Sequence, residues 1–152
     1  MKDEPQNTIN TLNKVIAALR DSQECLRKAA EKAENADLKL MLMDFSTQRA
    51  GFAGELQNEI ERLGNPDPRD EGTISGTLHR TWMELKSILT SDHDQAILGE
   101  CEHFEETLIK SYGAALDEKL PRYIRDLLES QLEQIGLARV QMRQIKRALS
   151  TA

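Results

Sequence analysis

Aromatic residues are scarce in this sequence, and so are the two residues that interrupt regular structure. The 152 residues include three phenylalanines, two tyrosines, one tryptophan, four prolines and eight glycines, whereas 30% of the residues are charged. This composition is typical of a mostly helical protein, and we expect no strands. A chain of this length supports one hydrophobic core, so we expect a single domain over residues 1–152.

The sequence also lacks an excess of positive charge, a long apolar run and a cysteine framework. Its formal net charge is -6, which argues against a general nucleic-acid binder, because neutralising phosphates needs a lysine and arginine excess on one face. No segment reaches the roughly 18 uninterrupted apolar residues of a membrane span, and no apolar leader begins the chain. We therefore expect a cytoplasmic protein with no membrane partner, in which Cys25 and Cys101 are free thiols.

Sequence motifs for catalysis are missing as well. There is no nucleophile elbow, no glycine-rich phosphate loop and no pair of cysteines at zinc-binding spacing. The helical wheels place Cys25 outward and Cys101 inward, and neither thiol lies beside a base or a helix N-terminus that would activate it. We expect no enzymatic activity and no cofactor.

The sequence does have long segments with apolar residues at helical spacing. Their boundaries carry residues typical of helix ends, among them Asn35, Gly64 and Pro121. We predict four long helices and one shorter helix, over residues 8–34, 37–63, 94–118 and 121–149, and over residues 73–89.

The lengths of the connections predict the topology. The first two long helices are joined by a tight link, as are the last two, so each pair forms an antiparallel hairpin. About 28 residues separate the two hairpins, and the short helix within them is long enough to carry the chain back along the bundle. The sequence therefore predicts an all-α, ferritin-like up-down four-helix bundle with a long crossover containing a short fifth helix. The alternative is a connector folded across one end.

A few polar residues fall inside the apolar stripes of these helices when each helix is placed on a wheel. Glu105 lies inside the stripe of the third long helix, with Glu102 at its edge, and Arg49 shares the inner face of the second. Gln23 and Gln131 lie inside the stripes of the first and last long helices. In antiparallel hairpins Gln23 is level with Arg49 and Glu105 with Gln131, to within about one turn.

Mid-bundle is where di-iron carboxylate proteins hold their metals, using a Glu from each of two helices and Glu-x-x-His from each of the other two. This sequence has Arg49 in place of an inward Glu or His, and Gln131 and Gln134 at the spacing of the last ligand pair. A buried carboxylate and a buried arginine neutralise each other. The leading interpretation is therefore a structural polar layer of Gln23, Arg49, Glu105 and Gln131.

Two alternatives to the structural layer stay open. One is a mononuclear or weak site for iron, manganese or zinc that uses Glu24, Glu102 and Glu105. The other is a pocket for a small polar ligand at the same level.

Several stretches of the sequence occur in an order that resembles a known family: "RAGFAGEL", "GTLHRTW", "ECEHFEE" and "YGAAL". The family consists of small bacterial proteins known as a domain of unknown function and grouped with ferritin-like four-helix bundles. The resemblance covers about Thr8 to Leu149. It implies the fold and brings no activity, substrate or cofactor with it.

Two functional hypotheses follow from these observations. The first is a non-enzymatic structural or interaction protein that binds a protein partner or itself, through apolar surface such as Met43 or Leu132; a stress-related role follows only by analogy with other bundles. The second is a metal-binding protein that uses Glu102 and Glu105.

Overall fold

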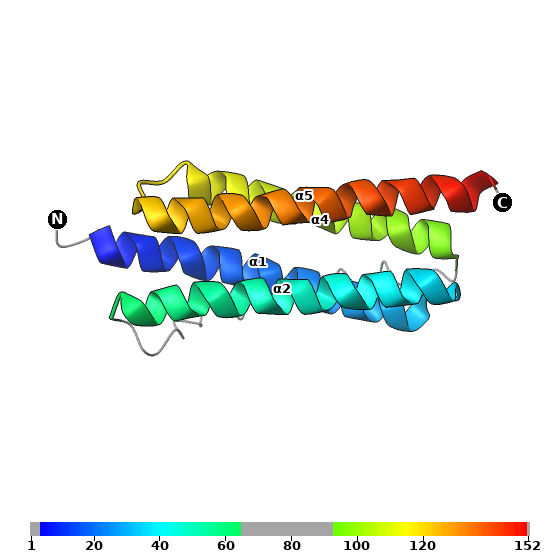
Figure 1. The fold of residues 1–152 in the computed structure, drawn as a ribbon, viewed down its shortest axis with the longest axis horizontal. Coiled ribbons are helices and arrows are strands. Elements are labelled where there is room, and N and C mark those ends of the chain that lie inside the picture. The colour runs from blue at the N-terminus through cyan, green and yellow to red at the C-terminus, as the bar shows by residue number, and fades with distance from the viewer. Residues whose placement is uncertain (1–3, 65–92, 152) are drawn as a thin grey trace.

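The computed structural model describes residues 4–64 and 93–151. In these residues the chain forms four α-helices and no strand (Figure 1): α1 Glu4–Lys32, α2 Ala36–Arg62, α4 Asp94–Leu116 and α5 Arg122–Thr151. The predicted all-α four-helix bundle is confirmed. The predicted short helix over residues 73–89 lies outside the described residues and stays a prediction.

The helices run up and down along one long axis (Figure 1). Helix α1 packs on both α2 and α4, α4 packs on α5, and the contact between α2 and α5 is sparse. Helix α2 ends and α4 begins at opposite ends of the bundle, so these two helices run parallel. That arrangement requires a long crossover between the hairpins, as the connection lengths predict.

The helix boundaries follow from local chemistry. Helix α1 begins at Glu4, earlier than the predicted residue 8, because Pro5 in the first turn needs no hydrogen-bond partner for its nitrogen. Asn35 is the N-cap of α2, and its side chain accepts a hydrogen bond of 2.9 Å from the Leu38 amide. Gly64 adopts φ 93° after the last turn of α2, a conformation that favours glycine.

The link between α1 and α2 is tied to the start of α4. The two carboxylate oxygens of Asp94 accept hydrogen bonds from the backbone amides of Glu34 and Asn35, both at 2.9 Å. Lys39 donates to the carbonyl oxygens of Ala30 and Glu31, at 2.7 and 3.2 Å, at the end of α1. Free backbone groups at this end of the bundle are thus partly satisfied by side chains.

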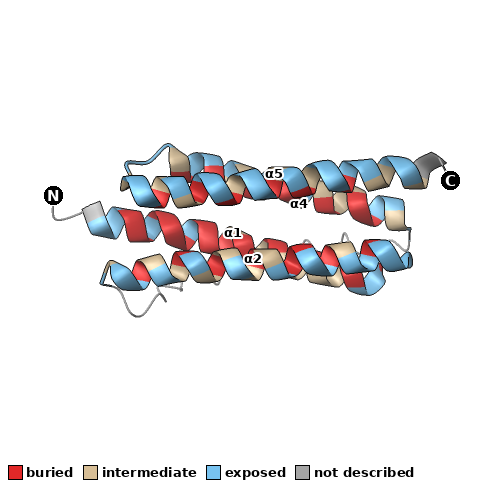
Figure 2. Ribbon diagram, viewed as in Figure 1, coloured by how far each residue is buried: buried red, intermediate tan, exposed pale blue. Residues whose placement is uncertain are grey.

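The interior holds two apolar clusters, one toward each end of the bundle. Buried residues lie on the sides of the helices that face the interior, whereas the outer faces are exposed (Figure 2). On each of the first three described helices a buried polar residue separates the clusters: Ser22 on α1, Arg49 on α2 and Glu105 on α4. The helices thus place these three side chains at one level, between two apolar halves.

Candidate functional site

Arg49 and Glu105 form an ion pair in the middle of the bundle. Nη1 of Arg49 lies 2.6 Å from Oε2 of Glu105, and the exposed fractions of the two residues are 0% and 1%. Arg49 Nη1 also donates to Ser22 Oγ at 2.9 Å, and Ser22 Oγ donates to Glu105 Oε2 at 3.3 Å. Side chains from α1, α2 and α4 therefore meet in one closed hydrogen-bonded triangle.

The surroundings of Arg49 supply further partners. Its Nε donates to Gln48 Oε1 at 3.1 Å, and its guanidinium carbon lies 6.0 Å from the centroid of the Phe45 ring. Nη2 of Arg49 and Oε1 of Glu105 are buried with no hydrogen-bond partner among the described residues. Each charge of the pair therefore depends on the other for most of its compensation.

Gln131 belongs to a second polar network that joins α2, α4 and α5. Its Oε1 accepts a hydrogen bond of 2.7 Å from the hydroxyl of Tyr112, and its Nε2 donates to Glu55 Oε1 at 2.9 Å and to the Phe52 carbonyl at 3.3 Å. Burial raises the pKa of Tyr112, so its hydroxyl stays protonated and acts as the donor. The four predicted layer residues thus do not form one network.

Gln23 was wrongly placed in the buried layer. It is only half-buried, and the inward position on α1 is taken by its neighbour Ser22, which is 3% exposed. Helix α1 packs on two helices at once, so its buried arc is wider than one apolar stripe and includes small polar residues. The backbone carbonyl of Gln23 accepts a hydrogen bond of 2.9 Å from Ser46.

Sequence reasoning missed Ser22, Tyr112 and Glu55 as members of the polar networks. Tyr112 lies in the apolar stripe of α4, and its phenol requires a partner when it is buried. That requirement was the signal available in the sequence. Ser22 and Glu55 carried no comparable signal, because serine and glutamate are common on exposed helix faces.

The three carboxylates of the alternative metal site are not grouped around one point, and each is paired with its own arginine. Both oxygens of Glu24 accept hydrogen bonds from Arg27, at 3.2 and 2.9 Å, and these bonds lower the pKa of Glu24. Glu102 lies 3.4 Å from Arg143, and Glu105 is bound by Arg49. In residues 4–64 and 93–151, no three His, Cys, Asp or Glu side chains are grouped to hold a metal ion.

The mid-bundle residues do not fit a di-metal centre of the ferritin type. Such a centre needs several carboxylates and histidines facing one point. The described residues instead offer one carboxylate, Glu105, whose Oε2 is already bound by a guanidinium and a hydroxyl. The positive charge of Arg49 would also repel a cation at this level.

Cys25 is buried and does not point outward, so its predicted orientation was wrong. Cys25 and Cys101 are each 1% exposed, and both are free thiols. The physical reason is again the wide buried arc of α1, whose Cys25 side faces α4.

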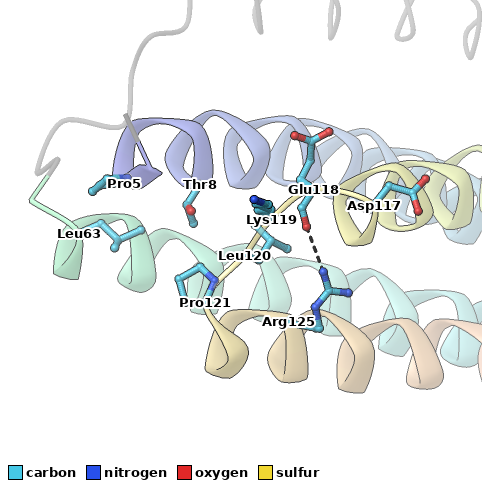
Figure 3. Close-up of a pocket in the computed structure, with 9 residues that line it drawn as sticks. All are labelled: Pro5, Thr8, Leu63, Asp117, Glu118, Lys119, Leu120, Pro121 and Arg125. Carbon is cyan, nitrogen blue, oxygen red and sulfur yellow. Dashed lines mark hydrogen bonds between the residues drawn. The ribbon is translucent and has the colours of Figure 1, made fainter. Parts of the chain in front are cut away.

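A hollow of about 700 Å³ lies at the end of the bundle where the link from α4 to α5 meets the ends of α1 and α2 (Figure 3). Its walls include Pro5, Leu63 and Leu120, and the guanidinium of Arg125 donates to the Glu118 carbonyl at 3.0 Å. Among these lining residues no hydrogen bond joins a hydroxyl to a base.

A membrane-spanning helix would need a long apolar stretch. In the part of the chain that the structure describes, no helix is both long enough and apolar enough for this.

Solved structures share this fold, among them the following two. One is a two-domain protein from Anabaena variabilis ATCC 29413 that contains DJ-1/ThiJ/PfpI-like and ferritin-like domains, with a TM-score of 0.79 and 17% identity; the match covers 97% of this chain and 41% of that one. The other is a mutant of Mycobacterium smegmatis Dps1, with a TM-score of 0.82 and 16% identity; the match covers 96% and 99% of the two chains. At these identities the likeness establishes the fold alone.

No curated protein matches the chain. A family model does match, over residues 7–118, which is most of the sequence. The family is described as a Domain of unknown function (DUF2383), and this agrees with the resemblance found in the sequence. The chain, a ferritin-like four-helix bundle, belongs to the DUF2383 family.

Proposed function

We propose that the protein is a non-enzymatic helical bundle that acts through its outer surface, by binding a second copy of itself, and that its centre is purely structural. The observation that carries the structural assignment of the centre is the ion pair of Arg49 and Glu105, joined at 2.6 Å and closed off from solvent. The pair occupies the level at which di-iron bundles hold metal.

Electrostatics support a structural role for this level. A divalent cation binds carboxylate oxygens that are free to coordinate it. Each of Glu24, Glu102 and Glu105 already interacts with an arginine, and for Glu105 both members of the pair are buried. Binding a cation at Glu105 would require the guanidinium of Arg49 to leave a position where it is fully desolvated, and no other described carboxylate contacts it.

Metal content tests this part of the proposal. We expect protein purified without chelators, incubated with iron, manganese or zinc and then desalted, to retain far less than one metal ion per chain by elemental analysis. The physical reason is that Glu24, Glu102 and Glu105 each already interact with an arginine. Stoichiometric metal that is lost in Glu102→Gln would overturn the proposal and establish the metal-binding alternative.

The outer surface carries apolar side chains that the bundle does not use. On α5, Leu137 and Val140 are 57% and 50% exposed and lie three residues apart, so they share one face of the helix. On α2, Leu40 and Met43 are exposed at the same spacing. Leu132, in contrast, is half-buried and packs against the interior, so its predicted role in self-association has no support.

Self-association tests the surface part of the proposal. We expect the wild-type protein to sediment as an oligomer and the double variant Leu137→Glu/Val140→Glu to sediment as a monomer, because charges in an apolar interface are costly to desolvate. The matched control is Gln95→Glu/Thr107→Glu, which adds the same charge at two exposed positions of another helix, α4. A monomeric wild-type protein, or equal dissociation in both variants, would contradict the proposed role of this face.

A further inference from the structure

Cys25 on α1 and Cys101 on α4 lie close together inside the bundle. Both are free thiols, both are 1% exposed, and both belong to the same apolar cluster. The two are close enough that Cys101 raises the pKa of the Cys25 thiol. These two are also the only cysteines of the 152-residue sequence.

The register of α1 and α4 accounts for this proximity. The helices run antiparallel, and Ser22 faces Glu105 with its Oγ 3.3 Å from Oε2. Three residues further along α1 is Cys25, and four residues back along α4 is Cys101, so both thiols lie one turn from the polar triangle on the same side. The register in which Ser22 faces Glu105 therefore also brings the two thiols to one level.

We propose that Cys25 and Cys101 are a redox-active dithiol that closes to a disulfide joining α1 to α4, with a hydroperoxide as the oxidant. This site lies outside the surface function proposed above and does not depend on it. Two buried cysteines that lie at the same level of an antiparallel helix pair, in one apolar cluster, need little backbone movement to bond.

The chemistry balances for one molecule of hydrogen peroxide. The sulfur of one cysteine attacks a peroxide oxygen, so an S–O bond forms, the O–O bond breaks, and one water leaves with a sulfenic acid left behind. The second thiol attacks the sulfenic sulfur, so the S–S bond forms, the S–O bond breaks, and a second water leaves. The two thiols lose two electrons, and the peroxide gains them.

The surroundings of the two thiols determine the rate of this oxidation. The neighbouring Cys101 and burial raise the pKa of the Cys25 thiol, which keeps this sulfur protonated at neutral pH. Neither thiol lines the groove of about 220 Å³ between α1 and α4, whose wall includes Ser22 and Phe104, and both cysteines are 1% exposed. Oxidation of the folded protein should therefore be slow and should speed up as the pH rises, because the thiolate is the nucleophile.

The test uses the full-length protein. After treatment with hydrogen peroxide, we expect a loss of mass of two hydrogen atoms and a peptide map in which the peptide with Cys25 is linked to the peptide with Cys101. The cross-link closes a loop of more than 70 residues, so the Tm should rise by about 10 °C and fall back when dithiothreitol is added.

The single variants Cys25→Ser and Cys101→Ser supply the controls. Neither should gain stability with peroxide, and each should stop at the sulfenic acid, which a dimedone probe detects. Three results in the wild-type protein would overturn the proposal: thiols that stay reduced until the protein is unfolded, a disulfide only between two chains, or an oxidised form with a lower Tm. All three are read from the wild-type protein, so they hold even where a variant folds poorly.

Discussion

Replacing Arg49 with leucine is expected to lower the free energy of unfolding by about 3–5 kcal/mol, because the substitution leaves Glu105 as an uncompensated buried charge. Glu105 is 1% exposed, and its Oε2 depends on Arg49 Nη1 at 2.6 Å and on Ser22 at 3.3 Å. The loss corresponds to a fall in Tm of roughly 6–20 °C for a chain of this size. Urea denaturation followed by circular dichroism measures it.

The double variant Arg49→Leu/Glu105→Leu separates the charge effect from a packing effect. With both charges removed, the interior at this level becomes apolar, and we expect most of the lost stability to return. A double-mutant cycle with Glu105→Leu then gives the coupling between the two side chains. An unchanged melting temperature in Arg49→Leu alone would show that the pair contributes nothing to the folded state.

Leu42→Ala is expected to lower the free energy of unfolding by about 2–5 kcal/mol, because it removes buried methyl groups and leaves a cavity. Leu42 is 0% exposed and belongs to the apolar cluster toward the start of α2. The same substitution at Leu40, two residues earlier and 67% exposed, should change the free energy by less than about 0.5 kcal/mol.

The two leucines share a helix, a residue type and a substitution, so they differ mainly in the face on which they lie. Thermal and urea unfolding of both variants compare the faces directly. Equal destabilisation by Leu40→Ala and Leu42→Ala in the isolated chain would contradict the orientation of α2. A larger effect of Leu40→Ala only in the associated protein would instead place Leu40 in the interface between copies.

The buried pair gives the bundle a specific alignment more than it adds stability. Helices joined only by apolar contacts can change register at a low cost in free energy. Arg49 and Glu105, in contrast, compensate each other's buried charge in one register only. The pair lies between the two apolar clusters, where it holds α2 against α4 and, through Ser22, against α1. The same register places Cys25 close to Cys101.

The fold was accessible from the sequence because it follows from local properties. Apolar residues at helical spacing predicted α1, α2, α4 and α5, and residues such as Asn35 and Gly64 predicted where two of the links lie. The lengths of the links predicted which helices pair as antiparallel hairpins and where the long connection lies. Each of these signals depends on neighbours within a few turns, and a single sequence contains them.

Contacts between helices depend on how the helices pack, and no local signal contains that information. A helical wheel treats a helix as having one buried side, whereas α1 packs on both α2 and α4. For this reason the helical wheel placed Gln23, and not Ser22, on the buried face. It also placed Cys25 on the exposed face, although Cys25 is 1% exposed. Residue types and their spacing were enough to show which side chains need a partner, and the packing of the helices selected the partner that each of them has.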